Sequence, residues 1–132
     1  MSAAEQAVRE RALAVLAGDA ALAAAVHGVF DGVPARATAP YVTVGAAEGR
    51  DWGTKDAAGR EVRLTLALVG AGRAADADGA AARIEAAAAL LRGNAAGWRI
   101  VAARVVRTRL SLAKDGGWRH EVVVRCRCLV AG

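Results

Sequence analysis

Aromatic residues are scarce in this sequence of 132 residues, which has only three tryptophans, one tyrosine and one phenylalanine. Prolines and cysteines are also few, with two of each. No apolar run approaches the roughly 18 residues that a membrane span needs, and no basic start followed by an apolar run marks a signal peptide. We therefore expect a single soluble domain over residues 1–132, without membrane contact, that acts in the cytoplasm or in a particle assembled there.

The two cysteines, Cys126 and Cys128, lie two residues apart in a segment typical of a β-strand. Their side chains would point to the same face of that strand, and strand neighbours of this kind fit disulfide geometry poorly. A metal site would need two further ligands, and the only histidines, His27 and His120, are isolated in the sequence. The pattern therefore favours buried thiols over a disulfide or a metal site.

Positive charge is concentrated near the C-terminus. The formal charge of the whole chain is +5, and residues 98–132 contain eight basic and two acidic residues. The arginines alternate with apolar residues, as expected for strands with one buried face. Such a basic face is compatible with plain solvation, with nucleic acid or with an acidic protein surface. Its candidate contact residues are Arg107, Arg109, Arg125 and Arg127.

Two long segments have the apolar spacing of helices. The first covers residues 2–18, where Ser2 and Glu5 have the spacing of a capping box. Asp19 then follows as a candidate cap for a short second helical piece. The second long helix is predicted over the alanine-rich residues 73–93, whose small side chains permit close approach to a sheet.

Four segments are typical of strands. They cover residues 41–45, 60–70, 98–112 and 119–131, while Asp31-Gly32, Pro34 and Pro40 predict a connector before the first of them. The third segment also fits a helix by periodicity, but its β-branched residues favour a strand with an irregularity. We expect an α+β fold of order α-β-β-α-β-β, in which two hairpins form an antiparallel four-stranded sheet with the two main helices packed on one face.

The sequence contains no recognisable catalytic motif. The only serines, Ser2 and Ser111, lie outside any nucleophile elbow. His120 precedes Glu121 on a predicted strand, where neighbours point to opposite faces. The segment "GAGRAADADGA" lacks the third glycine and the lysine that phosphate-binding loops contain. The sequence therefore predicts no enzyme, no cofactor and no metal.

Loops with large side chains are the remaining candidates for function, because tryptophan and arginine are enriched where proteins bind one another. Trp52 lies in the predicted hairpin loop 46–60, and Trp118 lies beside the second hairpin turn. Each tryptophan also has a purely structural interpretation. Trp52 can equally fold back onto its own sheet, and Trp118 can pack across its hairpin. Trp98 is expected to cover the end of the core. The candidate interface residues of the first loop are Arg50, Asp51, Trp52, Thr54, Lys55 and Asp56. Those of the second hairpin tip are Lys114 and Trp118.

Several stretches resemble the small tail completion proteins of long-tailed phages and gene transfer agents. The stretches are "VFDGVPARATAPYVTVG", "RDWGTKD", "EVRLTLALV", "WRIVAARVV" and "HEVVVRCRCLV", so the resemblance covers nearly the whole chain. The high alanine and arginine content departs from the family pattern. The clearest matches are Asp31, Gly32, Pro34, Pro40, Tyr41, Asp51, Trp52, Thr54 and Lys55.

The resemblance implies a tail terminator in a virion or gene-transfer-agent tail, assembled in the host cytoplasm. Proteins of this kind form a ring, typically a hexamer, that caps the head-proximal end of the tail tube, stops its elongation and meets the head–tail connector. The implied partners are copies of the same chain, the tail tube protein and the connector, with DNA only in transit through the lumen. The 46–60 loop would then dock on the tube or on a ring neighbour, and the basic face would line the lumen or meet a partner ring. The alternative is a small basic nucleic-acid-binding domain, which predicts salt-dependent DNA affinity for the isolated protein.

Overall fold

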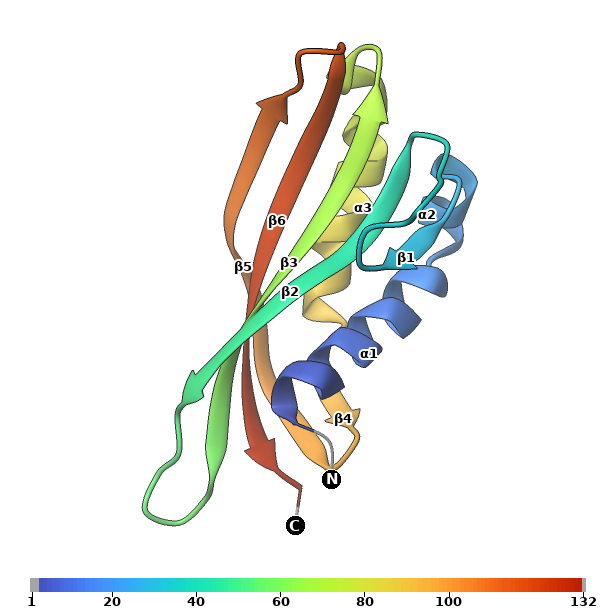
Figure 1. Cartoon of the computed structure of the whole chain (residues 1–132). Helices are drawn as coiled ribbons and strands as arrows, with labels where there is room; N and C mark the ends of the chain where they lie inside the picture. The colour runs from blue at the N-terminus through green and yellow to red at the C-terminus, as the bar shows by residue number, and fades with distance from the viewer. Residues whose placement is uncertain (1–2, 132) are drawn as a thin grey trace.

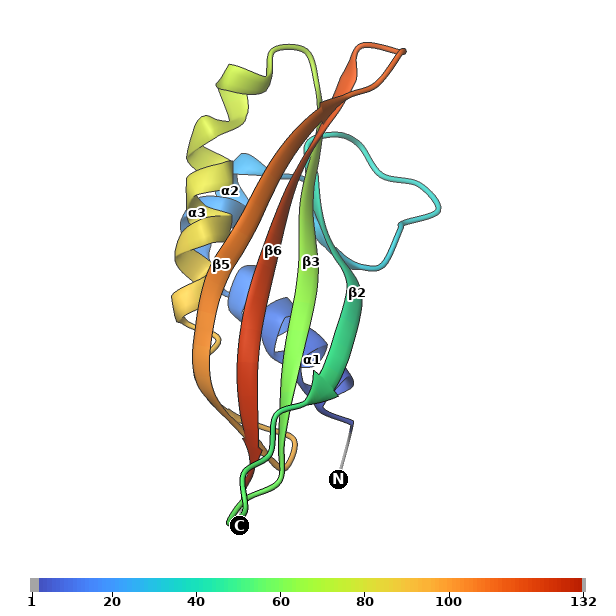
Figure 2. The same ribbon diagram turned by 90° about the vertical axis from the view of Figure 1, so that its left-hand side faces the viewer.

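The computed structural model describes residues 3–131 as a curved sheet that forms a half-barrel, with helices on one of its faces (Figures 1 and 2). The six strands lie in the order β1-β2-β3-β6-β5-β4. No helix among these residues is long and apolar enough to span a membrane. The elements are α1 (Ala4–Ala17), α2 (Ala20–Ala25), β1 (Val29–Asp31), β2 (Tyr41–Asp51), β3 (Gly59–Ala71), the 3-10 helix η1 (Ala74–Ala77), α3 (Asp78–Ala89), β4 (Gly93–Ala95), β5 (Trp98–Leu112) and β6 (Gly117–Val130).

The prediction of a four-stranded antiparallel sheet of order α-β-β-α-β-β is wrong. The sheet is mixed, because β1 pairs in parallel with β2 at one edge, while β4 pairs with β5 at the other. Each of these edge strands has three residues, too few to show the alternation from which strands are recognised. β1 lies in the segment predicted as a connector, and β4 begins where the second long helix is predicted to end.

The four long strands form two hairpins that join in the middle of the sheet. β2 pairs with β3, β5 pairs with β6, and the antiparallel contact of β3 with β6 connects the hairpins. β2 is longer than the predicted strand 41–45, because a register shift between Val44 and Ala47 lets pairing continue to Asp51. The loop of the first hairpin therefore covers residues 52–58 rather than 46–60. β5 has register shifts too, which agrees with the irregular strand predicted there.

Arginine and aspartate side chains fix the helices to the sheet and to one another. Ser2 of the predicted capping box lies outside the described residues, but Asp19 caps α2 as predicted, accepting a 2.9 Å hydrogen bond from the Leu22 N–H. Arg9 of α1 donates to the Val44 and Gly45 carbonyls at the register shift of β2, at 2.9 and 2.8 Å. These bonds hold the first helix against the irregular part of the strand.

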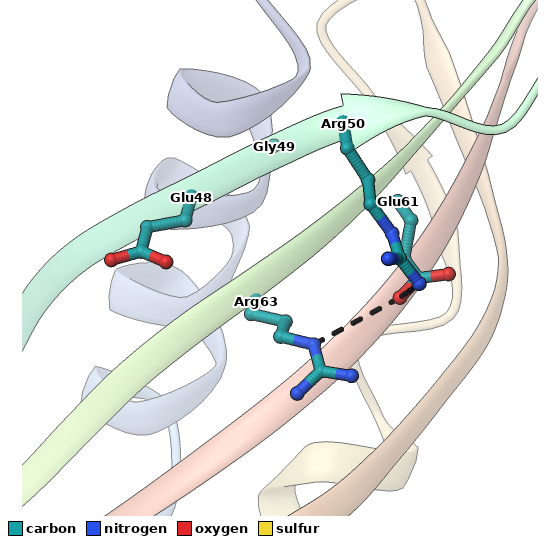
Figure 3. Close-up of a pocket in the computed structure, with 5 residues that line it drawn as sticks. All are labelled: Glu48, Gly49, Arg50, Glu61 and Arg63. Atoms are coloured by element: carbon teal, nitrogen blue, oxygen red, sulfur yellow. Dashed lines mark hydrogen bonds and ion pairs between the residues drawn. The ribbon is translucent and has the colours of Figure 1, made fainter.

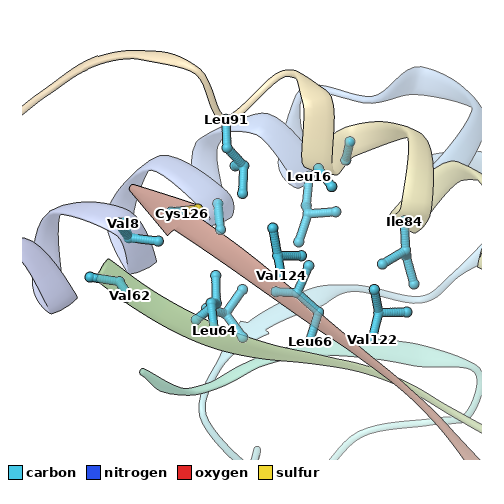
Figure 4. Close-up of a cluster of buried hydrophobic side chains, with 14 of the residues drawn as sticks. Val8, Leu16, Val62, Leu64, Leu66, Ile84, Leu91, Val122, Val124 and Cys126 are labelled. Atoms are coloured by element: carbon cyan, nitrogen blue, oxygen red, sulfur yellow. The ribbon is translucent and has the colours of Figure 1, made fainter. Parts of the chain in front are cut away.

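The core lies between the helices and one face of the sheet (Figure 4). Val62, Leu64, Leu66 and Leu68 alternate along β3 with residues of the other face, and all four are buried on this face. Burial of such a side chain contributes roughly 1.5–3 kcal/mol, so these rows fix which face of the sheet the helices cover. The matching row of β6 is Val122, Val124, Cys126 and Cys128, and α1, α3 and the segment after α3 add Val8, Leu16, Ile84 and Leu91.

Candidate functional site

One acidic side chain on the helix-free face of the sheet is buried, contrary to the alternation of β3. Glu61 keeps only 3% of its surface exposed. The strand register places Arg50 of β2 and Arg127 of β6 directly opposite it on either side. An acidic residue between two arginines on neighbouring strands is a favourable cross-strand arrangement, and it joins both hairpins.

The Glu61 carboxylate holds three guanidinium groups. Its Oε1 accepts a 3.0 Å hydrogen bond from Arg50 Nη2 and lies 3.9 Å from Arg63 Nε (Figure 3). Its Oε2 lies 3.5 Å from Arg127 Nε. Burial by itself would raise the pKa of Glu61, but the charge and hydrogen bond of Arg50, followed by the charges of Arg127 and Arg125, outweigh it. The net effect holds the pKa below its ordinary value, so Glu61 is a stable carboxylate at neutral pH.

Trp52 packs on its own subunit beside this carboxylate. The guanidinium carbon of Arg127 lies 5.4 Å from the centre of the Trp52 ring, within cation–π range. A Cβ at Gly59 would lie 3.1 Å from Trp52 Cε3, so the glycine leaves room for the ring. The backbone N–H of Trp52 also donates a 3.0 Å hydrogen bond to the Gly59 carbonyl. Of the two interpretations open from the sequence, this packing favours self-contact for much of the side chain, although Trp52 remains half-exposed.

The rest of the first loop is a compact turn at one end of the molecule (Figure 1). Thr54 Oγ1 accepts hydrogen bonds from the N–H groups of Asp56 and Ala57, at 3.3 and 3.2 Å. The Thr54 N–H donates to the Ala57 carbonyl at 2.8 Å. Lys55 and Asp56 are exposed at the tip. The threonine therefore shapes a turn whose charged tip is free for contact.

The two candidate residues of the second hairpin differ in burial. Trp118 is buried, with 5% of its surface exposed, and packs over Gly70, where an added Cβ would meet Trp118 Cζ2 at 2.2 Å. Lys114 is exposed at the turn. Lys114 is therefore the accessible candidate at this tip, while Trp118 belongs to the core together with Trp98.

The four basic candidates have different surroundings on the helix-free face. Arg127 is engaged by Glu61 and Trp52, whereas Arg107, Arg109 and Arg125 have no acidic group within ion-pairing distance among residues 3–131. Arg104, which was not among the candidates, lies directly opposite Arg125. The structure thus separates Arg127, which contacts a carboxylate and an aromatic ring, from three arginines that form no ion pair within residues 3–131.

The cysteines are free and buried in the core. Burial, followed by the charge of Cys128, raises the pKa of the Cys126 thiol to about 12. Burial, followed by the charge of Glu5, raises the pKa of the Cys128 thiol to about 11. Among the described residues, no group of three or more His, Cys, Asp and Glu side chains is placed to hold a metal ion.

Comparisons with known proteins agree on the class of this protein. A solved chain from the structure described as "Virion of native gene transfer agent (GTA) particle" is 27% identical, with a TM-score of 0.83. The match covers 97% of the present chain and 99% of that chain. Among curated proteins, none matches. The family described as "Tail completion protein gp17" matches residues 10–131, so the chain belongs to this family.

The family membership confirms the resemblance drawn from the sequence, and the protein is a structural component of a phage-type tail. The sequence did not single out Glu61. If a tight loop is assumed between the first two strands, the hairpin register places Arg50 opposite Glu61. The contact of Glu61 with Arg127 depends instead on the pairing of β3 with β6, which are 66 residues apart at this point.

Proposed function

We propose that this protein is a tail terminator, which forms a ring at the head-proximal end of the tail tube, stops elongation of the tube and joins it to the head–tail connector. The observation that carries the proposal is the match in sequence and fold, over nearly the full length of both chains, to a chain of a gene transfer agent particle. Membership of the tail completion family supports a role at the end of tail assembly rather than a free-standing nucleic-acid-binding domain.

The sheet has unpaired backbone at both of its edges, which supports ring formation. β1 pairs with β2 only as far as Val44, and β4 pairs with β5 only as far as Ile100. Within the described residues, no strand pairs with the outer edges of 46–51 and 102–112. Exposed strand edges invite pairing with another chain. Contacts between opposite edges are head-to-tail, and such contacts form a ring when the rotation from one copy to the next closes.

Apolar side chains are exposed at the same two sides of the molecule. Leu110 and Leu112 of β5 are 52% and 79% exposed. Val33 is 87% exposed in the loop 32–40, which projects beyond the β1–β2 side of the sheet, away from the helices (Figure 2). Large apolar groups at two opposed sides fit an interface between copies. We propose a hexameric ring built from these sides.

Two charged tips would contact the neighbouring components of the tail. Lys55 and Asp56 lie at the tip of the first hairpin, and Lys114 lies at the opposite end of the sheet (Figure 1). In this assignment, Arg50, Asp51, Trp52 and Thr54 support the first tip, which docks on the tube or on a ring neighbour. The second tip faces the next ring.

The test is to assemble particles with Leu110→Asp and Leu112→Asp together, because two buried charges would disrupt an interface between copies. Tails of irregular length without heads are expected. Leu90→Asp, at another exposed leucine that follows α3 and lies on no strand, serves as the control and should leave tails normal. Normal tail length and normal head joining with the double variant would exclude β5 from the ring contact. Normal tails in the complete absence of the protein would contradict the terminator function itself.

A further inference from the structure

Three arginines lie side by side on the helix-free face of the sheet. Arg63 of β3 is directly opposite Arg125 of β6, and Arg125 is directly opposite Arg104 of β5. Neighbouring strands are roughly 4.8 Å apart, so the three side chains start within about 10 Å of one another. We refer to these three residues as the arginine row.

The arginine row is poorly compensated within the subunit. Arg63 has one long contact, 3.9 Å to Glu61, while Arg104 and Arg125 have no ion pair within residues 3–131. The adjacent row is different, because Glu61 sits between its two arginines. Like charges directly opposite one another destabilise a sheet. Within the subunit the row contributes only the charges of Arg63 and Arg125 near Glu61, and it has the charge that an external anion requires.

A hollow of about 360 Å³ lies beside the row and extends over strands β2, β3, β6 and β5. Arg63 and Arg107 line it with Glu48 and Glu121. Its large apolar residues are Val106 and Val123, and it has no aromatic lining residue. Protein interfaces usually have an apolar or aromatic centre, so this surface is a poor match for a folded partner. Guanidinium groups pair with phosphate through two parallel hydrogen bonds.

We propose that the arginine row, extended by Arg107, binds the phosphate backbone of double-stranded DNA. DNA as the ligand rests on the proposed terminator function, in which DNA moves through the ring. Three carboxylates on the same face, those of Glu48, Glu61 and Glu121, reduce its net charge. They keep the contact weak, as transit requires. The helix-free face therefore forms the DNA path of the ring.

The test measures binding of a short fluorescent DNA duplex to the full chain by anisotropy, over a series of salt concentrations. The variant is Arg104→Glu with Arg125→Glu. The control is Arg36→Glu with Arg73→Glu, which makes the same change in net charge at two exposed residues that lie in loops and not on the strands of this face. We expect about tenfold weaker binding or more for the row variant, with a smaller salt slope because two phosphate contacts are lost. The control should change binding about twofold or less.

Three outcomes overturn the inference. No binding by the wild type at low salt excludes a DNA site, and equal losses in both variants assign the effect to overall charge. Unchanged DNA binding with failed joining to the connector would assign the row to an acidic protein partner. Circular dichroism and denaturant unfolding verify that the row variant is folded, and Arg104→Gln with Arg125→Gln replaces it if not. Failure to cap tubes, together with row-dependent DNA binding, would reject the terminator function and leave the row as a DNA site.

Discussion

Arg127 lies over the ring of Trp52 while its Nε faces the buried carboxylate of Glu61, at 5.4 Å and 3.5 Å respectively. One side chain of β6 thereby ties the loop of the first hairpin to the middle of the sheet. The tryptophan that stands in a polar, glycine-spaced loop has a reason within its own subunit. Its ring packs against Arg127 and Gly59 at the base of the loop whose charged tip is residues 55 and 56.

The stacking of Arg127 on Trp52 predicts a measurable coupling. In a double-mutant cycle of Trp52→Leu and Arg127→Ala, we expect about 0.5–1 kcal/mol of coupling in the free energy of unfolding, as for exposed cation–π pairs. Denaturant unfolding of the four proteins gives this value. The matched cycle of Trp52→Leu with Arg63→Ala should give nearly none, because Arg63 also lies near Glu61 but, in the described part of the chain, the cation–π contact of the ring is with Arg127. Equal coupling in both cycles would argue against the stack.

Glu61→Gln should lower the free energy of unfolding by about 1–3 kcal/mol at neutral pH, because Arg127 loses a buried counter-charge. The effect should depend on pH in a defined direction. Since the folded protein lowers the pKa of Glu61 below the ordinary 4.5, its stabilisation is complete above pH 4.5 and is lost as pH falls through the lowered value. The gap between wild type and variant should therefore shrink in acid.

The control for Glu61 is Glu48→Gln, an exposed carboxylate on the same face. It should change stability by about 0.5 kcal/mol or less, as most surface substitutions do. Unfolding curves collected from neutral pH into acid test both variants. A gap between wild type and Glu61→Gln that stays constant into strong acid would show that the carboxylate charge is not what stabilises this site.

Two glycines provide opposite predictions for the same substitution. Gly70→Ala should lower the free energy of unfolding by about 1–3 kcal/mol, because the new Cβ meets the ring of buried Trp118 at 2.2 Å. Gly79→Ala has open space and lies in α3, so it should raise stability by up to about 1 kcal/mol. Thermal unfolding measures both. A neutral Gly70→Ala would mean that Trp118 moves away from the sheet easily and is available at the hairpin tip.

The cysteines should be inert in the folded protein. Their raised thiol pKa values, about 12 for Cys126 and about 11 for Cys128, leave almost no thiolate at pH 8, and both side chains are buried. A thiol reagent should react with neither cysteine in the native protein and with both after unfolding. Rapid reaction of the native protein at pH 8 would contradict the burial of this end of β6.

The sequence predicted the parts of the fold that repeat over many residues. The alternation of β3 and β6 identified the buried rows, and Asp19 marked the start of α2. The three-residue strands β1 and β4 could not be predicted, because their existence depends on neighbours that are paired only in the folded sheet. The site has the same limit: Arg50, Glu61 and Arg127 are separated in sequence, and only the strand register unites them.

The arginine candidates illustrate why residue type alone is insufficient. Arg125 and Arg127 are equivalent by alternation, two residues apart on one strand. The structure gives Arg127 a carboxylate and an aromatic ring, but places Arg125 between two further arginines. Cross-strand neighbours decide whether a charge is structural or free, and they become visible only with the pairing of β3, β6 and β5.

The most direct test of the central claim is the native mass of the purified protein, measured alone and with tail tube subunits. We expect a closed ring of identical copies, six in number, either in solution or at the end of the tube. Loss of that species with Leu110→Asp and Leu112→Asp would connect the ring to the free edge of β5. A protein that remains monomeric under both conditions and never associates with tubes would exclude the ring and with it the terminator function.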